Sequence, residues 1–324
     1  MSNLYARYGA KRMRTVRASR VDYFTQDKPR VWRDHLGSLG LEGENAGRTF
    51  SFFHIFSFLT CHVLHNLITF DPISSVFLNL AAIAGPIPGK PDAMMAINYH
   101  APVAAATACV DLGFGHFVQS STQATNAERA GQVPYSRAKA MCDFHLSRLS
   151  GLPVTICCLG LLYCRTDGIV GQTRKTGKIN LIDLALLPLT PVLGDGSAPM
   201  QPQEVGDAAE RITFLAFADP ADRPYSSYRP HIDYNKDPEL ESKKFPPSKS
   251  ARFYDAVGPE TMSMLDMLSR FAKYHGNENF RPAFIDYRSM EELLNLKSLG
   301  NLNIQMVSLL RSEQSSNSPI IGKK

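Results

Sequence analysis

Residues 116–160 read HFVQSSTQATNAERAGQVPYSRAKAMCDFHLSRLSGLPVTICCLG, and their pattern indicates the fold class most directly. It opens on a short run that ends in hydroxyl side chains (116–121) and closes on the apolar run 154–160. Between them, residues 135–150 carry apolar side chains at helical spacing, with Gly151 as a stop. Short apolar runs predict buried strands, and a strand, a helix and a second strand predict a βαβ unit in a parallel sheet.

Outward from this stretch the alternation continues. Residues 76–82 (VFLNLAA) predict another buried strand, and residues 92–112 predict a helix that Pro102 begins or bends. Further elements are a helix over 205–218, a strand over 254–257 and a helix over 263–274, opened by a capping box of Ser263 and Asp266 and ended at Gly276. The predicted fold class is α/β.

The composition excludes several classes of protein. The chain has 324 residues, is 44% hydrophobic and has a formal net charge of +5, which excludes disorder throughout, collagen and a small disulfide scaffold. Six basic and no acidic side chains lie in the first twenty residues, so the rest of the chain is slightly acidic and a nucleic-acid role has weak support. Residues 1–21 have the composition of a mitochondrial presequence, which predicts a mitochondrial location; a solvated basic tail is the alternative.

Residues 50–70 (FSFFHIFSFLTCHVLHNLITF) contain no formal charge. Their length suits a membrane span, but three histidines and an asparagine within them favour one or two buried strands. The histidines are interpreted as hydrogen-bonded core residues, because no spacing supports a metal site. None of the six cysteines has C-x-x-C spacing, so neither zinc nor disulfides are expected, and Cys157 and Cys158 are predicted to be buried thiols on a strand in a reducing compartment.

The chemistry is predicted where the strands of the sheet end. Tyr135 and Lys139 are four residues apart on one predicted helix and therefore share a face. A lysine ammonium lowers the pKa of a neighbouring phenol, which makes tyrosine a usable general acid and base. Ligands of such sheets bind outside the carboxyl ends of the strands, here residues 81–82, 120–122 and 160–163. A hydroxyl among residues 120–122 is a candidate to polarise a carbonyl; a surface tyrosine stacked on a lysine stem is the alternative interpretation of the pair.

These motifs resemble the extended and atypical short-chain dehydrogenase/reductases, including the NAD-dependent epimerases and dehydratases. VFLNLAA resembles their strand on the adenosine side, YSRAKAMCDFHL their Tyr-Lys helix, and GLPVTICCLGLLYCRTD the strand and cofactor loop that follow. The resemblance covers residues 76–220 and 253–276 and implies a Rossmann-like doubly wound parallel sheet with a small C-terminal lobe. One branch looks most similar: the dehydrogenase-like accessory subunit of mitochondrial complex I, which is associated with bound NADPH and little turnover.

The resemblance implies NADP or NAD as the cofactor and assigns site residues. The implied catalytic residues are Thr122 (with Ser120 or Ser121 as alternatives), Tyr135 and Lys139. The implied cofactor contacts are Leu80, Ala81, Ala82, Asn98, Ser120, Ser121, Tyr135, Lys139, Gly160, Leu161 and Leu162. At Gly160 the epimerase-like members usually carry proline.

The N-terminal part departs from that family. Gly37, Gly40 and Gly43 have the spacing of a dinucleotide loop, but residues 31–36 are a poor strand and no apolar helix follows. The first half of the dinucleotide site is therefore expected to be incomplete or replaced, through loss of cofactor binding, an alternative module or a shifted reading frame.

The predicted divisions are a basic arm (1–21), an atypical segment (22–75), a dinucleotide-binding domain (76–218), a lobe (219–312) with a surface loop (219–252), and a tail (313–324). Three functions follow. The first is a dehydrogenase-like subunit of a mitochondrial membrane complex with little or no turnover. The second is an active oxidoreductase or epimerase that uses Tyr135. The third is a scaffold without cofactor that binds a partner through its surface loop.

Overall fold

The computed structural model describes residues 15–18, 49–53, 75–83, 92–126, 134–164, 168–169, 185–217 and 251–286. The described residues fall into two compact units. The first, here the sheet unit, lies within residues 1–121, 138–157 and 212–254, and the second, here the lobe unit, within residues 122–137, 158–211 and 255–324.

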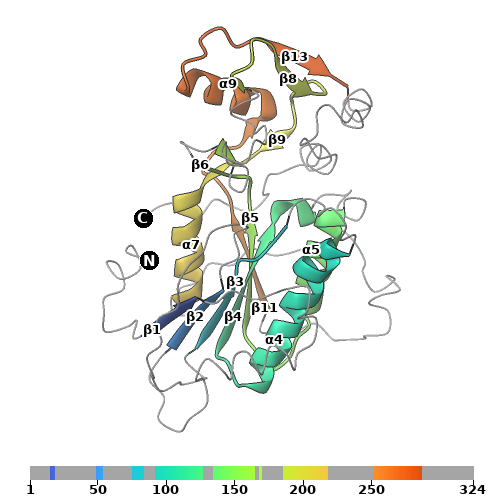
Figure 1. The fold of residues 1–324 in the computed structure, drawn as a ribbon, viewed down its shortest axis with the longest axis vertical. Helices are drawn as coiled ribbons and strands as arrows, with labels where there is room; N and C mark the ends of the chain where they lie inside the picture. The colour runs from blue at the N-terminus through green and yellow to red at the C-terminus, as the bar shows by residue number, and fades with distance from the viewer. Residues whose placement is uncertain are drawn as a thin grey trace. The chain divides into compact units, whose positions relative to one another are not determined.

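The sheet runs in the order β1-β2-β3-β4-β5-β11 (Figure 1). Its strands are β1 (Thr15–Ala18), β2 (Thr49–Phe53), β3 (Val76–Asn79), β4 (His116–Thr122), β5 (Val154–Leu159) and β11 (Ala251–Ala256). The pairs β1–β2, β2–β3 and β3–β4 are all parallel, and Asn79 is aligned with Gln119 at the end of the third pair. The predicted parallel sheet is confirmed.

Burial explains why the central strands read as apolar runs. Every residue of β3 and β4 is buried, as are the first five of β5, the pattern of parallel strands covered on both faces. Phe77 and Phe117 form the centre of this core, with stacked rings whose centroids lie 5.0 Å apart. Cys157 and Cys158 are buried thiols on β5, as predicted.

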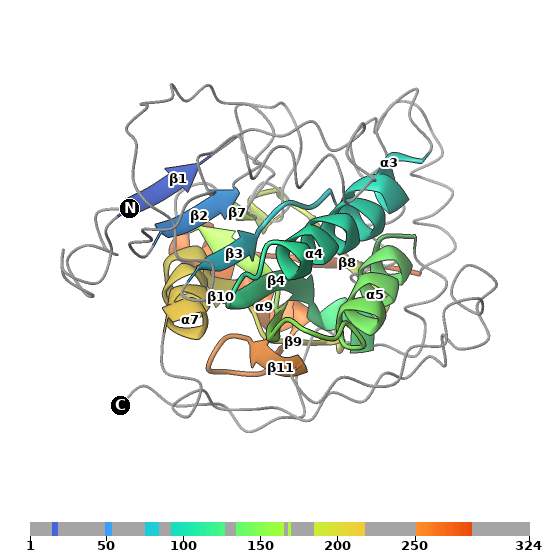
Figure 2. The same ribbon diagram turned by 90° about the horizontal axis from the view of Figure 1, so that it is seen from below.

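Helices cover both faces of this sheet (Figure 2). On one face lie α4 (Ala101–Asp111) and α5 (Pro134–Leu146), and on the other lies the C-terminal half of α7 (Val205–Phe217). This confirms the predicted α/β class. The strand order follows the chain, whereas doubly wound dinucleotide folds reverse it near their first strands. The departure lies at β1 and β2, in the part expected to be incomplete or replaced.

The helix predicted over 92–112 is divided into three. It begins as α3 (Ala93–Met95), continues as the π-helix η2 (Ala96–His100) and resumes as α4. Pro102 at the start of α4 explains the division, because proline has no N–H for the carbonyl one turn earlier and its ring collides with that carbonyl. The Ala101 N–H bonds instead to the Ala96 oxygen five residues back, which widens the turn.

Other boundaries differ by a few residues. The helix predicted over 135–150 ends at Leu146, because Arg148 and Leu149 donate to carbonyls only three residues back and tighten the last turn. The strand predicted over 254–257 is longer and begins at Ala251. Residues 54–74 lie outside the described ranges, and within those ranges no helix has the length and apolar character to cross a membrane.

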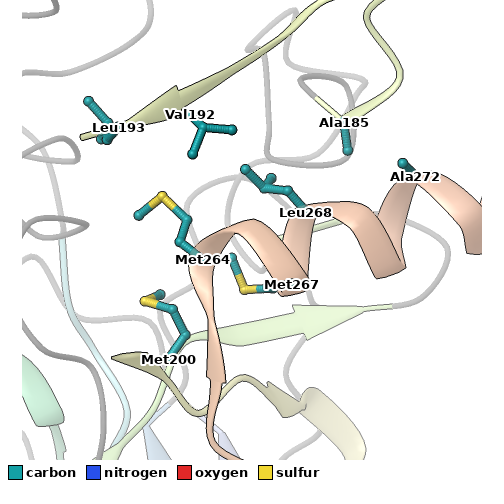
Figure 3. Close-up of a cluster of buried hydrophobic side chains, with 8 residues drawn as sticks. All are labelled: Ala185, Val192, Leu193, Met200, Met264, Met267, Leu268 and Ala272. Atoms are coloured by element: carbon teal, nitrogen blue, oxygen red, sulfur yellow. The ribbon is translucent and has the colours of Figure 1, made fainter. Parts of the chain in front are cut away.

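The lobe unit is built from small sheets. Its strands are β6 (Leu162–Cys164), β7 (Gly168–Ile169), β8 (Thr190–Leu193), β9 (Pro199–Met200), β10 (Gln203–Glu204), β12 (Met262–Ser263) and β13 (Pro282–Ile285). They pair as β10-β6-β7, β12-β9 and β13-β8. A methionine-rich cluster forms the core of this unit (Figure 3): Ala185, Val192, Leu193, Met200, Met264, Met267, Leu268 and Ala272. Unbranched methionine side chains fill the irregular space between such short elements.

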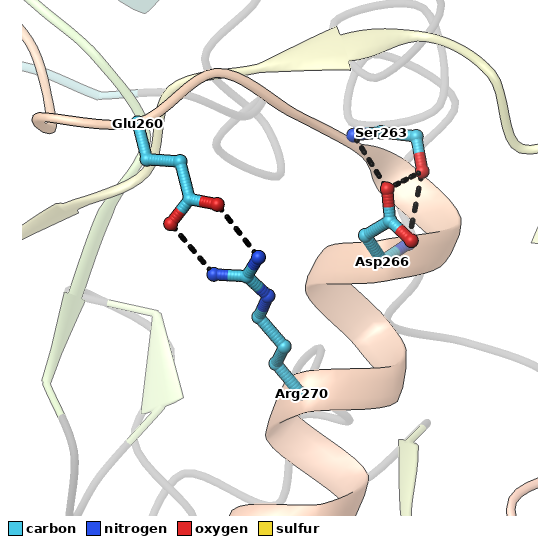
Figure 4. A network of polar contacts seen from close by, with 4 residues as sticks. All are labelled: Glu260, Ser263, Asp266 and Arg270. Carbon is cyan, nitrogen blue, oxygen red and sulfur yellow. Dashed lines mark hydrogen bonds and ion pairs between the residues drawn. The ribbon is translucent and has the colours of Figure 1, made fainter.

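The helix of this lobe, α9 (Met264–Tyr274), begins as predicted. The Ser263 hydroxyl accepts from the Asp266 N–H at 3.0 Å, and the Asp266 carboxylate accepts from the Ser263 N–H at 3.3 Å (Figure 4). Gly276 follows the helix with a φ of +84°, the left-handed conformation that ends helices. Glu260 and Arg270 form a two-bond ion pair on its surface.

Candidate functional site

The predicted site residues lie on the expected elements. Those of the sheet unit are Leu80, Ala81 and Ala82 after β3, Asn98 in η2, Ser120 and Ser121 at the end of β4, and Lys139 on α5. Those of the lobe unit are Thr122, Tyr135, Gly160, Leu161 and Leu162. Tyr135 lies one helical turn before Lys139 on α5, as the spacing predicts.

Lys139 is the centre of the site in the sheet unit. Only 1% of the residue is exposed, and its Nζ donates to the Ser120 carbonyl oxygen at 2.9 Å. Burial lowers the pKa of this ammonium, and the Coulombic influence of Cys142 and Asp143 opposes that lowering. A lysine has three N–H donors. One is engaged with β4, and among the described residues no hydrogen bond of the other two is found.

A chain of amides ties the end of β3 to this lysine. The Asn79 Nδ2 donates to the Gln119 Oε1 at 2.8 Å, and the Gln119 Nε2 donates to the Ser120 oxygen at 2.8 Å. The Ser120 carbonyl thus accepts from both Gln119 and Lys139. All of these side chains are buried. The network sets the positions of two adjacent strand ends and of the ammonium together.

The segment after β3 is held by two asparagines. The Asn79 Oδ1 accepts from the Ala81 N–H at 3.2 Å. The Asn98 Oδ1 accepts from the Ile83 N–H at 3.1 Å, and the Asn98 Nδ2 donates to the Ile83 oxygen at 2.8 Å. Asn98 lies on the π-helical turn caused by Pro102, which orients its side chain toward this segment. Ala82 remains exposed between these two anchors.

Asp143 also belongs to this cluster and was not predicted from sequence. It lies one turn after Lys139 on α5, is 0% exposed, and its Oδ2 accepts from the Ser121 hydroxyl. Its Oδ1 is buried without a hydrogen-bond partner in the described structure. Burial raises the pKa of this carboxyl to about 7, against the opposing effects of Ser121 and Lys139. Four-residue spacing from Lys139 is the sequence signal that could have found it.

The lobe unit contains the other half of the predicted set. The Thr122 hydroxyl accepts from the Ala124 N–H at 3.3 Å, and Gln123 donates to the Cys158 oxygen at 3.0 Å and to the Asp255 Oδ1 at 2.8 Å. Gln123 is fully buried and was also missed from sequence. It links the segment after β4 to the ends of β5 and β11.

Gly160 has a structural requirement for glycine. Its N–H donates to the Ala256 oxygen at 2.9 Å, a bond that proline cannot make. A Cβ at this position would lie 2.6 Å from the Gln201 carbonyl oxygen, so any side chain would force the backbone to move. The departure from proline noted in the sequence therefore follows from local packing.

The donor set fits hydroxyl-bearing ligands better than cations. The groups near the strand ends are an ammonium, amides and hydroxyls, which suit ribose hydroxyls and carbonyls. Among the described residues, no group of three or more His, Cys, Asp or Glu side chains is placed to hold a metal ion.

The chain matches no family model and no curated protein. Solved structures similar to it include MoeE5 in complex with UDP-glucose and NAD, at 13% identity and a TM-score of 0.47 over 93% of this chain and 97% of that one. Another is DesIV, a dTDP-glucose 4,6-dehydratase from Streptomyces venezuelae with NAD and TYD bound, at 13% identity and 0.46 over 92% and 96%. A third is the UDP-glucuronic acid 4-epimerase from Bacillus cereus in complex with NAD, at 14% identity and 0.46 over 93% and 97%. The likeness is one of fold alone.

Proposed function

We propose that this chain binds NAD(P) and is a dehydrogenase-like protein of the short-chain type. The observation that carries the proposal is the buried ammonium of Lys139, bonded at 2.9 Å to the Ser120 carbonyl at the carboxyl end of β4, one helical turn from Tyr135. Burying a lysine is costly, so a buried lysine that is hydrogen-bonded to the carbonyl at the end of a parallel strand supports a functional role.

The residues present fit one half of a dinucleotide. The remaining N–H groups of Lys139 suit the hydroxyls of the nicotinamide ribose, and the exposed Ala82 after β3 suits the adenosine side. A bound nicotinamide would supply hydride transfer. The chain's own part is to hold the ribose through Lys139 and to move a proton at the phenol oxygen of Tyr135. The glycines at 37, 40 and 43 lie outside the described residues.

Titration of the full chain with NADH and NADPH, followed by nucleotide fluorescence, tests the proposal. Lys139→Met is expected to weaken binding at least tenfold, while Lys273→Met, an exposed lysine on α9, leaves it unchanged. Absence of binding by the folded wild-type chain would refute the proposal and leave a scaffold without cofactor. If binding is found, Tyr135→Phe separates an active enzyme from a silent one, because only an active enzyme has turnover to lose.

A finer proposal concerns the place of this activity. The acid-free basic arm and the resemblance to the complex I accessory subunit support a mitochondrial subunit with little or no turnover. Import of the full chain into isolated mitochondria, followed by capture from detergent extracts, tests both parts. Failure of import would refute the location, and import without recovery in a membrane complex would refute the subunit role.

A further inference from the structure

Asp143 and Lys139 form a buried pair of opposite ionisable groups. They lie four residues apart on α5 and are 0% and 1% exposed. Each also bonds to the end of β4, Lys139 to the Ser120 carbonyl and Asp143 to the Ser121 hydroxyl. Two adjacent residues of β4 therefore hydrogen-bond to the two ionisable groups of α5.

The charge of Lys139 needs a compensating anion, because a buried cation without one is strongly disfavoured. Two groups act on it, Cys142 and Asp143. Burial raises the pKa of the Cys142 thiol, so this group stays neutral at physiological pH. The Asp143 carboxylate is therefore the group left to balance the ammonium.

The unpartnered Oδ1 of Asp143 supports a role beyond packing. A group that served only to bind Ser121 needs one oxygen, and a hydroxyl would provide it without a second polar atom left buried and unsatisfied. A carboxyl group at position 143 is explained if its negative charge has a role in the site.

We propose that Asp143 is a positioning residue of the nucleotide site: its carboxylate keeps Lys139 charged and, through Ser121, holds the end of β4 in place. The inference rests on the proposed function, since a charged Lys139 is the group proposed to bind the ribose hydroxyls. It also makes the site sensitive to pH. Asp143 titrates near neutrality, facing Lys139 and Cys142 on its own helix and Ser121 on β4, so acidification removes the countercharge.

The test measures the charge of Lys139 directly, by NMR of the full chain labelled with [13Cε]lysine. The Lys139 signal is assigned by its loss in Lys139→Met. In Asp143→Asn, which keeps an acceptor for Ser121, the titration midpoint of Lys139 is expected to fall by one pH unit or more. Ser121→Ala, which removes the hydrogen bond but not the charge, and Asp111→Asn, an exposed carboxyl at the end of α4, are expected to change it much less.

An unchanged midpoint in Asp143→Asn would overturn the proposal. Should that variant not fold, the wild-type chain decides: the Lys139 signal must show a step at the pH where the Asp143 carboxyl titrates, and its absence refutes the coupling. Nucleotide titration in the same samples keeps the two ideas apart. A shifted Lys139 midpoint without nucleotide binding would refute the proposed function and support the charge coupling. Nucleotide binding with an unshifted midpoint would support the proposed function and refute the charge coupling.

Discussion

Asp143→Asn is expected to remove a pH dependence of stability that the native chain has. Burial raises the pKa of the Asp143 carboxyl from 3.8 to about 7. Between about pH 4 and pH 7 the native state therefore keeps a proton that the unfolded chain has released. The contribution of Asp143 to stability is present in full below this window and is lost as the pH rises through it.

The magnitude follows from the shift. About three pKa units at about 1.4 kcal/mol each make roughly 4 kcal/mol, spread over the window. This is a large part of a typical unfolding free energy of about 5–15 kcal/mol. Urea unfolding followed by circular dichroism, at half-unit steps from pH 4 to 7.5, measures it. The quantity of interest is the unfolding free energy of the native chain minus that of Asp143→Asn, which cancels the titrating groups that are not coupled to Asp143.

That difference is expected to fall steadily as the pH rises. Asp266→Asn provides the control, because hydrogen bonds from Ser263 lower the pKa of this exposed carboxyl. Its effect appears only below about pH 4, so its difference stays level across the window. A level difference for Asp143→Asn as well would show that the carboxyl titrates normally in the native state and would refute the reasoning from burial.

Three further substitutions test the packing, each by urea unfolding at neutral pH. Phe117→Ala, at a fully buried position, is expected to cost about 3–5 kcal/mol, whereas Phe284→Ala, 57% exposed, stays within about 0.5 kcal/mol; equal costs would contradict the core assignment. Gly258→Ala places a methyl group against the Pro202 carbonyl and is expected to cost about 1–3 kcal/mol; a neutral result would mean that this backbone yields freely. Ser263→Ala removes a helix cap and is expected to cost about 1 kcal/mol, and no loss would show that this hydrogen bond adds nothing net to stability.

Elements with strong local signals were predictable from sequence. The runs VFLN, HFVQSST and VTICCL were predicted as buried strands, because short runs of this kind between turn signals are typical of buried parallel strands. The capping box before α9 was equally predictable, since its two hydrogen bonds involve residues three apart.

The π-helical turn before Pro102 could not be predicted from local sequence signals. A proline near a helix start is compatible with a new helix, a kink or a widened turn, and the choice depends on what the neighbouring side chains bond to. Here Asn98 is held by both backbone groups of Ile83, a contact across fifteen residues. The requirement for glycine at position 160 was equally unpredictable, because it comes from the close approach of the Gln201 carbonyl oxygen.

The site divides along the same line. The spacing of Tyr135, Lys139 and Asp143 places them on one face of a helix, which follows from the sequence because the helical repeat is local. The burial of Lys139 and Asp143, and their hydrogen bonds to Ser120 and Ser121, depend on the packing of α5 against β4 and could not be predicted from the sequence. The charge of a group depends on the water it loses and the partners it gains. The partners come from β4, 19 and 22 residues away in the chain.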